Sequence, residues 1–370
     1  MARAGLSPDW QCMFANDFDE KKAASYRSNW GNDELWAGDV HELPHSLEKF
    51  PGIADLAWAS FPCQDLSLAG NLSGLSGARS SAFWGFHDVL YGLKLTGRLP
   101  RSVVVENVLG LLTANGGSDF HQVCKSLDLL GYNFGALVMD ARHFLPQSRP
   151  RLFVFAVLKS QPLSGEVTCE AAPNDWVNSS LKRAFSLLPH HLKPSWRWWN
   201  VAPPPVTRPS LDSQIESDPK DVDWHTKSET DRLLSMMSEP SRARLNSALD
   251  TGKRVVGTAY RRTRPDPTGV KSQRTELRMD GVAGCLRTPG GGSSRQFIVI
   301  AENGKVKSRL LSARETARLM GLSDDYILPL NYNEAYHLAG DGLAVPVVRH
   351  LGRFINGIVR PTSNIMIAAE

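Results

Sequence analysis

The sequence predicts a doubly wound α/β domain with a mostly parallel sheet, together with a second, smaller domain. Two observations indicate this class. Residues 10–160 alternate short apolar runs with amphipathic stretches, which is the pattern of strands joined by crossover helices. The chain of 370 residues also exceeds the roughly 250 to 300 at which a single core stops growing, so two lobes are expected.

The strands expected in the α/β domain are short segments rich in apolar and β-branched residues. They are Cys12–Ala15, Asp55–Ser60, Val103–Glu106, Phe134–Met139 and Leu152–Val157. Ligands of doubly wound sheets bind beyond the carboxyl ends of the strands. Polar or reactive residues that directly follow these segments are therefore the first candidates for a functional site.

A second domain is expected where the alternating pattern stops. From about Lys159 the chain carries the proline-rich run Ala202–Pro205 and polar segments without a sustained period. The cluster Trp196–Trp199 is assigned to the core of this small domain. The apolar segment Phe297–Ile300 then marks a return to the first domain. We therefore predict domain limits of 1–159, 160–295 and 296–370.

A helix is expected after the return, because Ser312 is followed three residues later by Glu315. Serine and glutamate at this spacing form a capping box, in which each side chain bonds the backbone N–H of the other. The start of this helix is therefore predicted at Ser312.

Net charge and the distribution of apolar residues limit the class of protein that the sequence can encode. The net charge of +4 and the sequence pI near 8.8 agree with a polyanionic partner but are too mild to prove one. Between Lys253 and Arg295 basic residues greatly outnumber acidic ones, which suggests a phosphate-binding footprint. No apolar run approaches the roughly 20 residues that span a bilayer, and no signal peptide is evident. We predict a cytoplasmic monomer that does not bind membranes.

The five cysteines give neither a metal site nor a disulfide framework, because they lie far apart with no Cys-x-x-Cys pair. No metal is therefore expected, and a reducing compartment fits this usage. The cysteines are Cys12, Cys63, Cys124, Cys169 and Cys285.

Cys63 stands in the segment Phe61-Pro62-Cys63-Gln64, directly after the predicted strand Asp55–Ser60. Proline fixes φ and removes a donor, so the turn is rigid and the thiol is held at the end of the strand. A nucleophile is displayed in this way at the edge of a parallel sheet. Taken alone, a small buried cysteine after a turn is the commoner reading.

Two further segments deliver charged groups beside strands. Glu106 and Asn107 end the β-branched run that begins at Ser102, and Arg149 and Arg151 precede the apolar run from Leu152. Residues two apart in a strand point to one face, so both guanidinium groups should lie on the same side. Cysteine, glutamate and arginine thus all arise at strand ends. For Glu106 and the arginines, the bland alternative is a structural ion pair.

The ordered motifs Pro62-Cys63-Gln64, Glu106-Asn107-Val108 and Gln147-Ser148-Arg149-Pro150-Arg151 resemble those of the DNA (cytosine-5) methyltransferases. The resemblance runs from Ala4 to the helix-like segment Ala344–Val348, with one variable region between. It implies a Rossmann-like methyltransferase sheet in which 1–159 is catalytic and 160–295 recognises the target. The implied cofactor is S-adenosylmethionine, and the implied partner is double-stranded DNA.

The resemblance assigns catalytic roles to the residues of these motifs. The thiolate of Cys63 would attack C6 of a cytosine that is flipped out of the duplex, so that C5 accepts the methyl group. Glu106 would hydrogen-bond the Watson–Crick edge at N3, and Asn107 would steady its turn. Arg149 and Arg151 would orient the catalytic groups and contact the base or the adjacent backbone.

The resemblance also assigns cofactor contacts. Asp17 would accept from the ribose hydroxyls, Phe18 would stack on adenine and Asp39 would accept from the adenine amino group. Pro62 and Asp341 complete the predicted set. The family's usual Gly-Asn stands here as Gly340-Asp341, which puts the role of Asp341 in doubt. For Asp17 and Asp39 the bland alternative is a helix or turn cap.

Contacts with DNA are expected from the loop over the pocket and from the recognition segment 285–296. Glycines and hydroxyls allow close approach to phosphates, and arginines can read guanine in the major groove. A flexible hairpin is the alternative for this segment. The predicted DNA contacts are Arg79, Gln147, Arg287, Thr288, Ser293 and Arg295.

One departure from the family concerns the first strand. The Phe-x-Gly-x-Gly motif, whose glycines let the backbone approach the cofactor, would lie immediately before Met1. Either the start lies at an internal methionine, or the chain is a naturally shortened product that could be inactive. Two other functions therefore stay open beside a DNA methyltransferase: a tRNA cytosine-5 methyltransferase, and a DNA-binding relative without catalysis.

Overall fold

The computed structural model describes residues 1–370 except 62–81, 206, 266–268, 270, 289–294 and 361–370. The chain forms two compact units that interleave along the sequence. Unit 1 comprises residues 1–5, 140–149 and 204–348, and unit 2 comprises 6–139, 150–203 and 349–370. The functional limits predicted at 159 and 295 stay predictions, because compactness does not test which part binds DNA.

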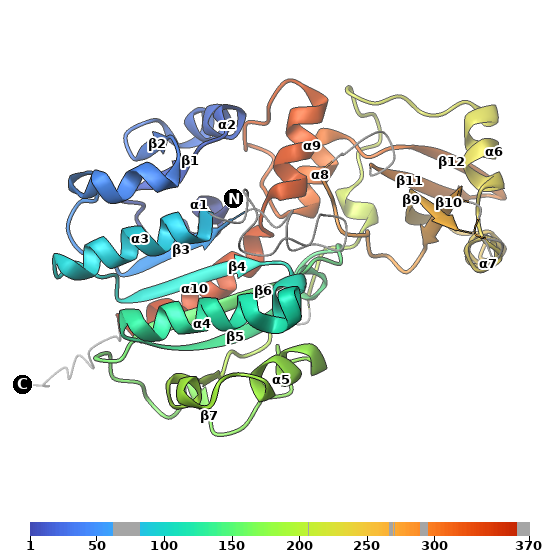
Figure 1. Cartoon of the computed structure of the whole chain (residues 1–370). Helices are drawn as coiled ribbons and strands as arrows, with labels where there is room; N and C mark the ends of the chain where they lie inside the picture. The colour runs from blue at the N-terminus through green and yellow to red at the C-terminus, as the bar shows by residue number, and fades with distance from the viewer. Residues whose placement is uncertain (62–81, 206, 266–268, 270, 289–294, 361–370) are drawn as a thin grey trace, which may run out of the picture. The chain divides into compact units, whose positions relative to one another are not determined.

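Unit 2 is built on a four-stranded mixed sheet of order β3-β4-β6-β5 (Figure 1). Its strands are β3 (Leu56–Ser60), β4 (Ser102–Asn107), β5 (Tyr132–Asp140) and β6 (Pro150–Leu158). β3 and β4 are parallel, whereas β6 runs antiparallel to β4. The described part of unit 2 has a second parallel pair, β1 (Ala15–Asp17) and β2 (Leu35–Ala37), that forms a separate sheet.

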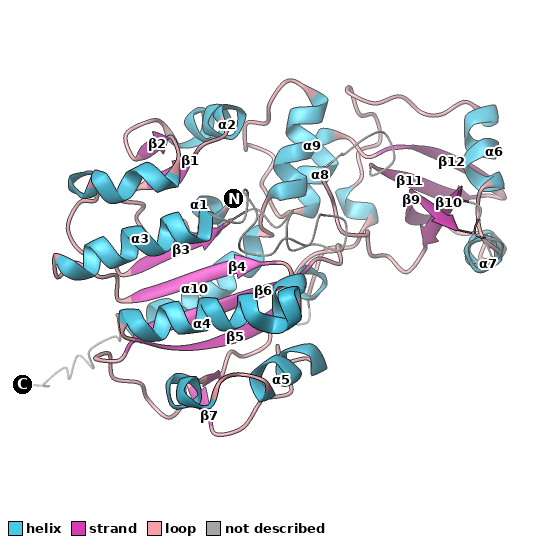
Figure 2. Ribbon diagram, viewed as in Figure 1, coloured by secondary structure: helices cyan, strands magenta, loops and turns pink. Residues whose placement is uncertain are grey.

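Helices cover both faces of the four-stranded sheet (Figure 2). On one face, α3 (Ala82–Leu95) and α4 (Ser118–Leu130) pack on Val103 and Val105 of β4. On the other face, Phe155 of β6 contacts Trp199 and Phe354, the latter from α10 (Val345–Val359). β4 is buried along its whole length, as expected of a strand covered on both sides. The remaining elements of this unit are α2 (Glu20–Trp30), α5 (Ser179–Ser186), β7 (Thr168–Cys169) and β8 (Trp198–Trp199).

Two expectations for this unit are wrong in detail. The first strand begins at Ala15 rather than Cys12, because pairing with the neighbouring strand starts at Ala15 opposite Leu35. The tryptophan cluster does not form the core of the small domain. Trp196 packs edge-on against Phe134 of β5, and the indole N–H of Trp199 donates to the Phe155 carbonyl at 3.2 Å, so the cluster belongs to the core of the α/β sheet.

Unit 1 contains a four-stranded antiparallel sheet of order β10-β9-β11-β12. Its strands are β9 (Val255–Pro265), β10 (Lys271–Arg278), β11 (Gln296–Glu302) and β12 (Lys305–Leu310). Helices α6 (Lys227–Ser235) and α7 (Glu239–Asp250) pack on one face through Leu233 and Leu245. Helices α8 (Ala313–Leu319) and α9 (Tyr332–Asp341) pack on the other. The short helix α1 (Ala2–Leu6) begins in this unit.

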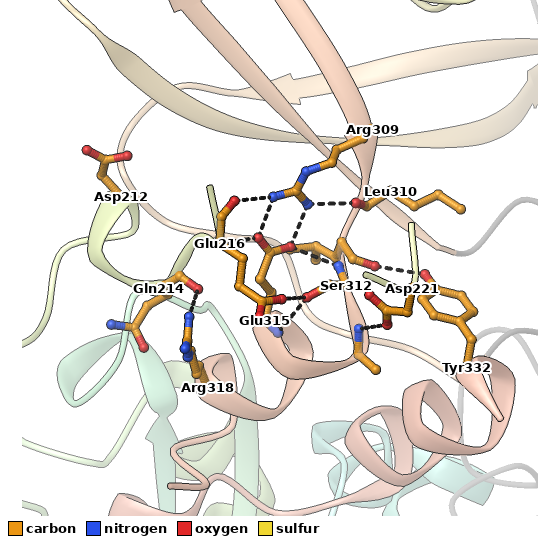
Figure 3. A network of polar contacts seen from close by, with 12 residues as sticks. Asp212, Gln214, Glu216, Asp221, Arg309, Leu310, Ser312, Glu315, Arg318 and Tyr332 are labelled. Atoms are coloured by element: carbon orange, nitrogen blue, oxygen red, sulfur yellow. Dashed lines mark hydrogen bonds and ion pairs between the residues drawn. The ribbon is translucent and has the colours of Figure 1, made fainter. Parts of the chain in front are cut away.

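The predicted helix start at Ser312 is confirmed, and it lies in a buried polar network (Figure 3). Glu315 and Ser312 complete the capping box, while Arg309 of β12 donates to both carboxylate oxygens of Glu315 at 2.7 and 2.6 Å. Both side chains of this ion pair are 0% exposed. The backbone N–H of Glu216 also donates to Glu315 at 2.8 Å, so the network ties the segment before α6 to β12 and α8.

Candidate active site and recognition unit

The carboxyl end of β4 and the start of β6 lie at the same end of the four-stranded sheet, and each carries one of the three sequence motifs. β3 and β4 are parallel with Ser60 opposite Glu106, so the chain leaves β3 beside the end of β4. β6 is antiparallel to β4 with Phe153 opposite Glu106, so β6 starts at the same edge. The carboxylate at the end of β4 and the arginine at the start of β6 therefore meet.

Glu106 and Arg151 form an ion pair at this edge. Arg151 Nε lies 3.4 Å from Glu106 Oε1, and the two side chains are 16% and 9% exposed. The Nη1 of Arg151 donates to the carbonyl of Pro150 at 2.9 Å, which further fixes the guanidinium. A carboxylate held by an arginine in a largely buried position has a defined orientation toward a ligand at the sheet edge. Whether the two residues are catalytic stays a prediction.

Asn107 joins the ends of β3 and β4. Its Nδ2 donates to the carbonyl of Phe61 at 3.2 Å, and its Oδ1 accepts from the backbone N–H of Val108 at 2.8 Å. The amide therefore holds both the turn after Glu106 and the residue from which the chain runs to Pro62 and Cys63. Pro62, Cys63 and Arg79 lie outside the described residues.

The four described cysteines differ in how well they could serve as nucleophiles. Cys124 is fully buried in the core, and desolvation raises the pKa of its thiol far above the ordinary value. Burial of this kind suppresses the thiolate, which is the reactive form. Cys12 donates to the carbonyl of Phe14 at 3.5 Å, and Cys285 lies 3.5 Å from a guanidinium nitrogen of Arg149.

The predicted cofactor residues of the N-terminal part gather at the ends of the parallel strands β1 and β2. Asp17 ends β1 opposite Ala37, and the backbone N–H of Gly38 donates to its carbonyl at 3.1 Å. Phe18 directly follows Asp17 and is 75% exposed. Asp39 follows Gly38, so both carboxylates stand at one edge of the two-stranded sheet.

One oxygen of each of these two carboxylates accepts a hydrogen bond from a backbone N–H two residues further along the chain. Oδ1 of Asp17 accepts from the backbone N–H of Asp19 at 2.9 Å, and Oδ1 of Asp39 accepts from that of His41 at 3.0 Å. Asp39 is the N-cap of the 3₁₀ helix Val40–His45. The capping role that the sequence left open is thus present at both positions, and it also orients the carboxylates.

Asn16 contributes to the same edge and was missed by the sequence reasoning. Its Nδ2 donates to the carbonyls of Trp36 and Gly38 at 3.1 and 2.8 Å, which fastens the end of β1 to the end of β2. Its position between the apolar strand and Asp17 is the signal that could have identified it.

Arg149 lies in unit 1, where its guanidinium donates to three backbone carbonyls. Its Nη1 donates to the carbonyl of Leu286 at 2.8 Å, and its Nη2 donates to those of Gly340 and Gly342 at 2.8 and 2.7 Å. The residue is only 3% exposed. Five donors in a rigid fork suit this convergence of backbone carbonyls. The arginine therefore fixes the backbone at Leu286, which lies in the segment 285–296 predicted to contact DNA.

Gln147, a predicted DNA contact, is a buried residue of unit 1. Its side chain is 0% exposed, and its Nε2 donates to the carbonyl of Leu319 at 2.5 Å. Its Oε1 accepts from the backbone N–H of Leu286 at 3.4 Å. The side chain thus joins Leu319 to Leu286 within unit 1, and its contact with DNA stays a prediction.

The remaining predicted residues of unit 1 that the structure describes lie beside the two ends of α9. Thr288, a predicted DNA contact, donates to the carboxylate of Asp341, a predicted cofactor contact. Arg295 donates to Asn333 on α9, and Arg287 is exposed. Ser293 lies outside the described residues.

Asp140 is a further residue that the sequence reasoning missed. Its Oδ1 accepts from the backbone N–H groups of Arg149 and Arg142 at 2.7 and 3.1 Å, and Ser148 Oγ lies 3.3 Å from its Oδ2. This carboxylate closes the loop between β5 and the motif that contains Arg149. An aspartate at the end of a strand, followed by a turn, is the available signal.

The described residues contain no group of three or more acidic, histidine or cysteine side chains arranged to hold a metal ion. Outside the masked segments, every helix is too short or too polar to cross a lipid bilayer.

The fold defines a class of protein: an α/β unit with a mixed four-stranded sheet, and a second unit built on an antiparallel sheet. Comparison with known proteins then gives the family. The model for the C-5 cytosine-specific DNA methylase family matches residues 1–357, and the chain belongs to this family. The family predicted from the three motifs is confirmed.

Curated relatives match over different lengths. M.BanI of Aneurinibacillus aneurinilyticus, a Type II methyltransferase, is 30% identical over 153 residues, which are 41% of this chain and 33% of the relative. The chain thus spans about a third of this relative in that match. M.HhaI of Haemophilus parahaemolyticus, also a Type II methyltransferase, is 24% identical over 345 residues, 92% of this chain and 86% of the relative.

Solved structures confirm the fold. The Dnmt2 methyltransferase of S. pombe covers 97% of this chain and 95% of its own, with a TM-score of 0.58 at 16% identity. A putative DNA modification methyltransferase from a prophage of E. coli covers 97% and 95%, with a TM-score of 0.56 at 14% identity. The predicted α/β methyltransferase fold is therefore correct.

Proposed function

We propose that this chain transfers a methyl group from S-adenosylmethionine to C5 of a cytosine flipped out of duplex DNA, with Cys63 as the nucleophile. The observation that carries the proposal is the ion pair of Glu106 and Arg151 at 3.4 Å, located where β3 ends and the chain continues to Cys63. Membership of the C-5 cytosine-specific DNA methylase family supports it. The Type II methyltransferases among the relatives favour DNA over tRNA as substrate.

Cys63 follows Phe61 by two residues in the sequence, and Phe61 is the last described residue after β3. Asn107 Nδ2 donates to the carbonyl of Phe61 at 3.2 Å, which fixes the end of the described chain beside Glu106. Among the described cysteines, Cys124 is buried in the core, and burial suppresses its thiolate.

The proposed reaction forms a bond between the Cys63 sulfur and C6 of the ring, and the electron pair displaced from the C5–C6 double bond makes C5 nucleophilic. Glu106 would hydrogen-bond N3 and limit negative charge on the ring during the attack. C5 would then accept the methyl group, and the electron pair of the broken methyl–sulfur bond would stay on the donor sulfur as a neutral thioether. A base would take the C5 proton, and the bond between C6 and the Cys63 sulfur would break to restore the thiolate. Arg151 would hold the Glu106 carboxylate in place through these steps.

The residues at the ends of β1 and β2 fit an adenosine-type cofactor. The carboxylate of Asp17 suits ribose hydroxyls, and the exposed ring of Phe18 offers a surface on which a purine can stack. Asp39 stands on the neighbouring strand end as an acceptor. When bound, S-adenosylmethionine supplies an electrophilic methyl group on a sulfonium.

Transfer of labelled methyl groups to duplex DNA and to tRNA tests the proposal. We expect label in DNA with the wild-type chain and none with Cys63→Ala. Label in tRNA alone would replace the proposal with the tRNA methyltransferase. Absence of both transfer and S-adenosylmethionine binding would leave a DNA-binding relative without catalysis.

A further inference from the structure

Asn16 on β1 uses both hydrogens of its side-chain amide on the chain of the neighbouring strand. Its Nδ2 donates to the carbonyl of Trp36 at 3.1 Å and to that of Gly38 at 2.8 Å. A side-chain amide has two N–H donors and one oxygen, which can only accept. Because an oxygen that faced both carbonyls would be repelled by them, the amide has a single orientation. The position of its Oδ1 is therefore fixed as well.

The oxygen of this amide is left available to a ligand. Among the residues that the structure describes, none donates a hydrogen bond to Oδ1 of Asn16. The side chain is exposed, so solvent and ligands reach it. An amide oxygen has two lone pairs and accepts from hydroxyl or amino groups. Asn16 therefore offers a neutral acceptor that is already oriented by the bonds of its nitrogen.

This acceptor lies beside the two carboxylates of the candidate cofactor edge. Asn16 directly precedes Asp17, and Gly38, whose carbonyl it binds, directly precedes Asp39. Side chains of consecutive strand residues leave opposite faces, so Asn16 and Asp17 flank a group that lies across the end of β1. Ligands of α/β folds lie there, beyond the carboxyl ends of the strands. The end of β1 therefore presents an acceptor on either side of a bound group.

A ribose suits this arrangement because its two adjacent hydroxyls bring two donors. One carboxylate oxygen of Asp17 already accepts from the backbone N–H of Asp19 at 2.9 Å. An acceptor on a second residue lets the two hydroxyls pair with different side chains. A neutral amide also adds no charge to an edge that carries the carboxylates of Asp17 and Asp39, and like charges placed close together disfavour each other.

We propose that Asn16 is a cofactor contact, and that its Oδ1 accepts a hydrogen bond from one ribose hydroxyl of S-adenosylmethionine. Its Nδ2 meanwhile holds the carbonyls of Trp36 and Gly38, and Asp17 takes the other hydroxyl. Removal of the side chain loses the ligand contact and both carbonyl contacts, whereas removal of the hydroxyl loses the ligand contact alone. The inference rests on the proposed function, since it takes an adenosine-type cofactor as the ligand, and it adds a residue to the ribose site.

Isothermal titration calorimetry on the full-length chain tests the contact without requiring methyl transfer. The ligands are S-adenosylhomocysteine and its 2′-deoxy and 3′-deoxy analogues, and the proteins are wild type and Asn16→Ala. For wild type, we expect loss of the hydroxyl that Asn16 binds to weaken affinity by about 3- to 10-fold. Asn16→Ala should bind every ligand more weakly and should be indifferent to the loss of that hydroxyl.

The pattern over the three ligands separates a ligand contact from a structural role. If Asn16 only fastened β1 to β2, Asn16→Ala would weaken all three ligands by one common factor and keep the wild-type sensitivity to both hydroxyls. That result would overturn the inference. A wild-type chain that binds all three ligands equally would overturn it as well.

Asn32→Ala is the matched control, because Asn32 is an exposed asparagine of the same unit whose Oδ1 accepts from Arg27 Nε at 3.0 Å. It should keep the wild-type affinity for every ligand. If circular dichroism shows that Asn16→Ala does not fold, Asn16→Val takes its place, since a β-branched residue favours a strand and has no acceptor. Failure of the proposed function would appear differently, as a wild-type chain that binds none of the three ligands, and it would remove the inference with it.

Discussion

One arginine–glutamate pair of unit 1 and one of unit 2 are built differently. In unit 1, Arg309 and Glu315 are both 0% exposed and form two hydrogen bonds at 2.7 and 2.6 Å. In unit 2, Arg151 and Glu106 are separated by 3.4 Å and retain some exposure. The first carboxylate also completes a helix cap, whereas the second ends a strand at the edge of its sheet.

The difference indicates which pair stabilises the fold and which is available to a ligand. Glu315 is saturated by Arg309, by the backbone of Ser312 and by that of Glu216, so its removal would leave a buried arginine uncompensated. The Glu106 pair is looser and stands at the strand ends where ligands of α/β folds bind. A buried ion pair alone is therefore a poor marker of function, and its location at a strand end is the informative feature.

The largest expected effect is on activity at the looser pair. Glu106→Gln removes the acid–base function while keeping the shape of the side chain, so methyl transfer should fall by about 100- to 10 000-fold. The free energy of unfolding should fall by about 1 to 2 kcal/mol, less than for Glu315→Ala, because the amide oxygen of glutamine can still accept from Arg151. Steady-state transfer of labelled methyl groups and urea unfolding measure the two quantities. An active Glu106→Gln variant would remove this residue from the mechanism.

Substitution in the Arg309–Glu315 pair should instead lower stability. Glu315→Ala leaves Arg309 buried without its partner, and we expect a loss of about 3 to 5 kcal/mol in the free energy of unfolding of unit 1. Glu302→Ala, at an exposed glutamate, is the control and should change it by about 0.5 kcal/mol or less. Urea unfolding followed by tryptophan fluorescence measures both. Equal effects of the two substitutions would contradict the contrast between the pairs.

Arg149 and Arg151, the two arginines of one motif, should differ in the same way but with smaller effects. Arg149→Lys removes the fork that serves the carbonyls of Leu286, Gly340 and Gly342, and should destabilise the chain by about 1 to 3 kcal/mol. Arg151→Lys keeps the charge beside Glu106 and should lower activity more than stability. Thermal unfolding and methyl transfer are measured on both variants. The opposite ranking would exchange the two roles.

The smallest effect is expected at the proposed cofactor edge. Asp39→Asn can still cap the helix Val40–His45, because asparagine and aspartate are comparable N-caps, so stability should be kept. Loss of a charged acceptor should weaken S-adenosylmethionine binding by about tenfold, which corresponds to about 1.4 kcal/mol. Isothermal titration calorimetry measures the dissociation constant. Unchanged affinity would place the adenine elsewhere.

Local features of the fold could be predicted from the sequence, because they depend on residues close together in the chain. The cap of Ser312 and Glu315 and the strand that ends at Glu106 are of this kind. The destination of the tryptophan cluster could not be predicted, since Trp196 and Trp199 pack on strands some 40 to 60 residues earlier. Aromatic composition shows that a core exists but not which sheet it covers.

The candidate site shows the same limit. Motif order identified Glu106 and Arg151, and the register of β3, β4 and β6 explains how they meet. The burial of Gln147 could not be anticipated, because its partner Leu319 lies 172 residues away. The contacts of Asn16 likewise depend on the pairing of β1 with β2, because its partners Trp36 and Gly38 lie 20 and 22 residues away.

Covalent trapping on duplex DNA that contains 5-fluorocytosine tests the central claim most directly, because fluorine at C5 cannot leave as a proton does and the enzyme stays joined to the ring. With S-adenosylmethionine present, we predict a complex of wild-type chain and DNA that survives denaturing electrophoresis. Cys63→Ala should form none while still binding the duplex. A complex that persists in Cys63→Ala would contradict the account.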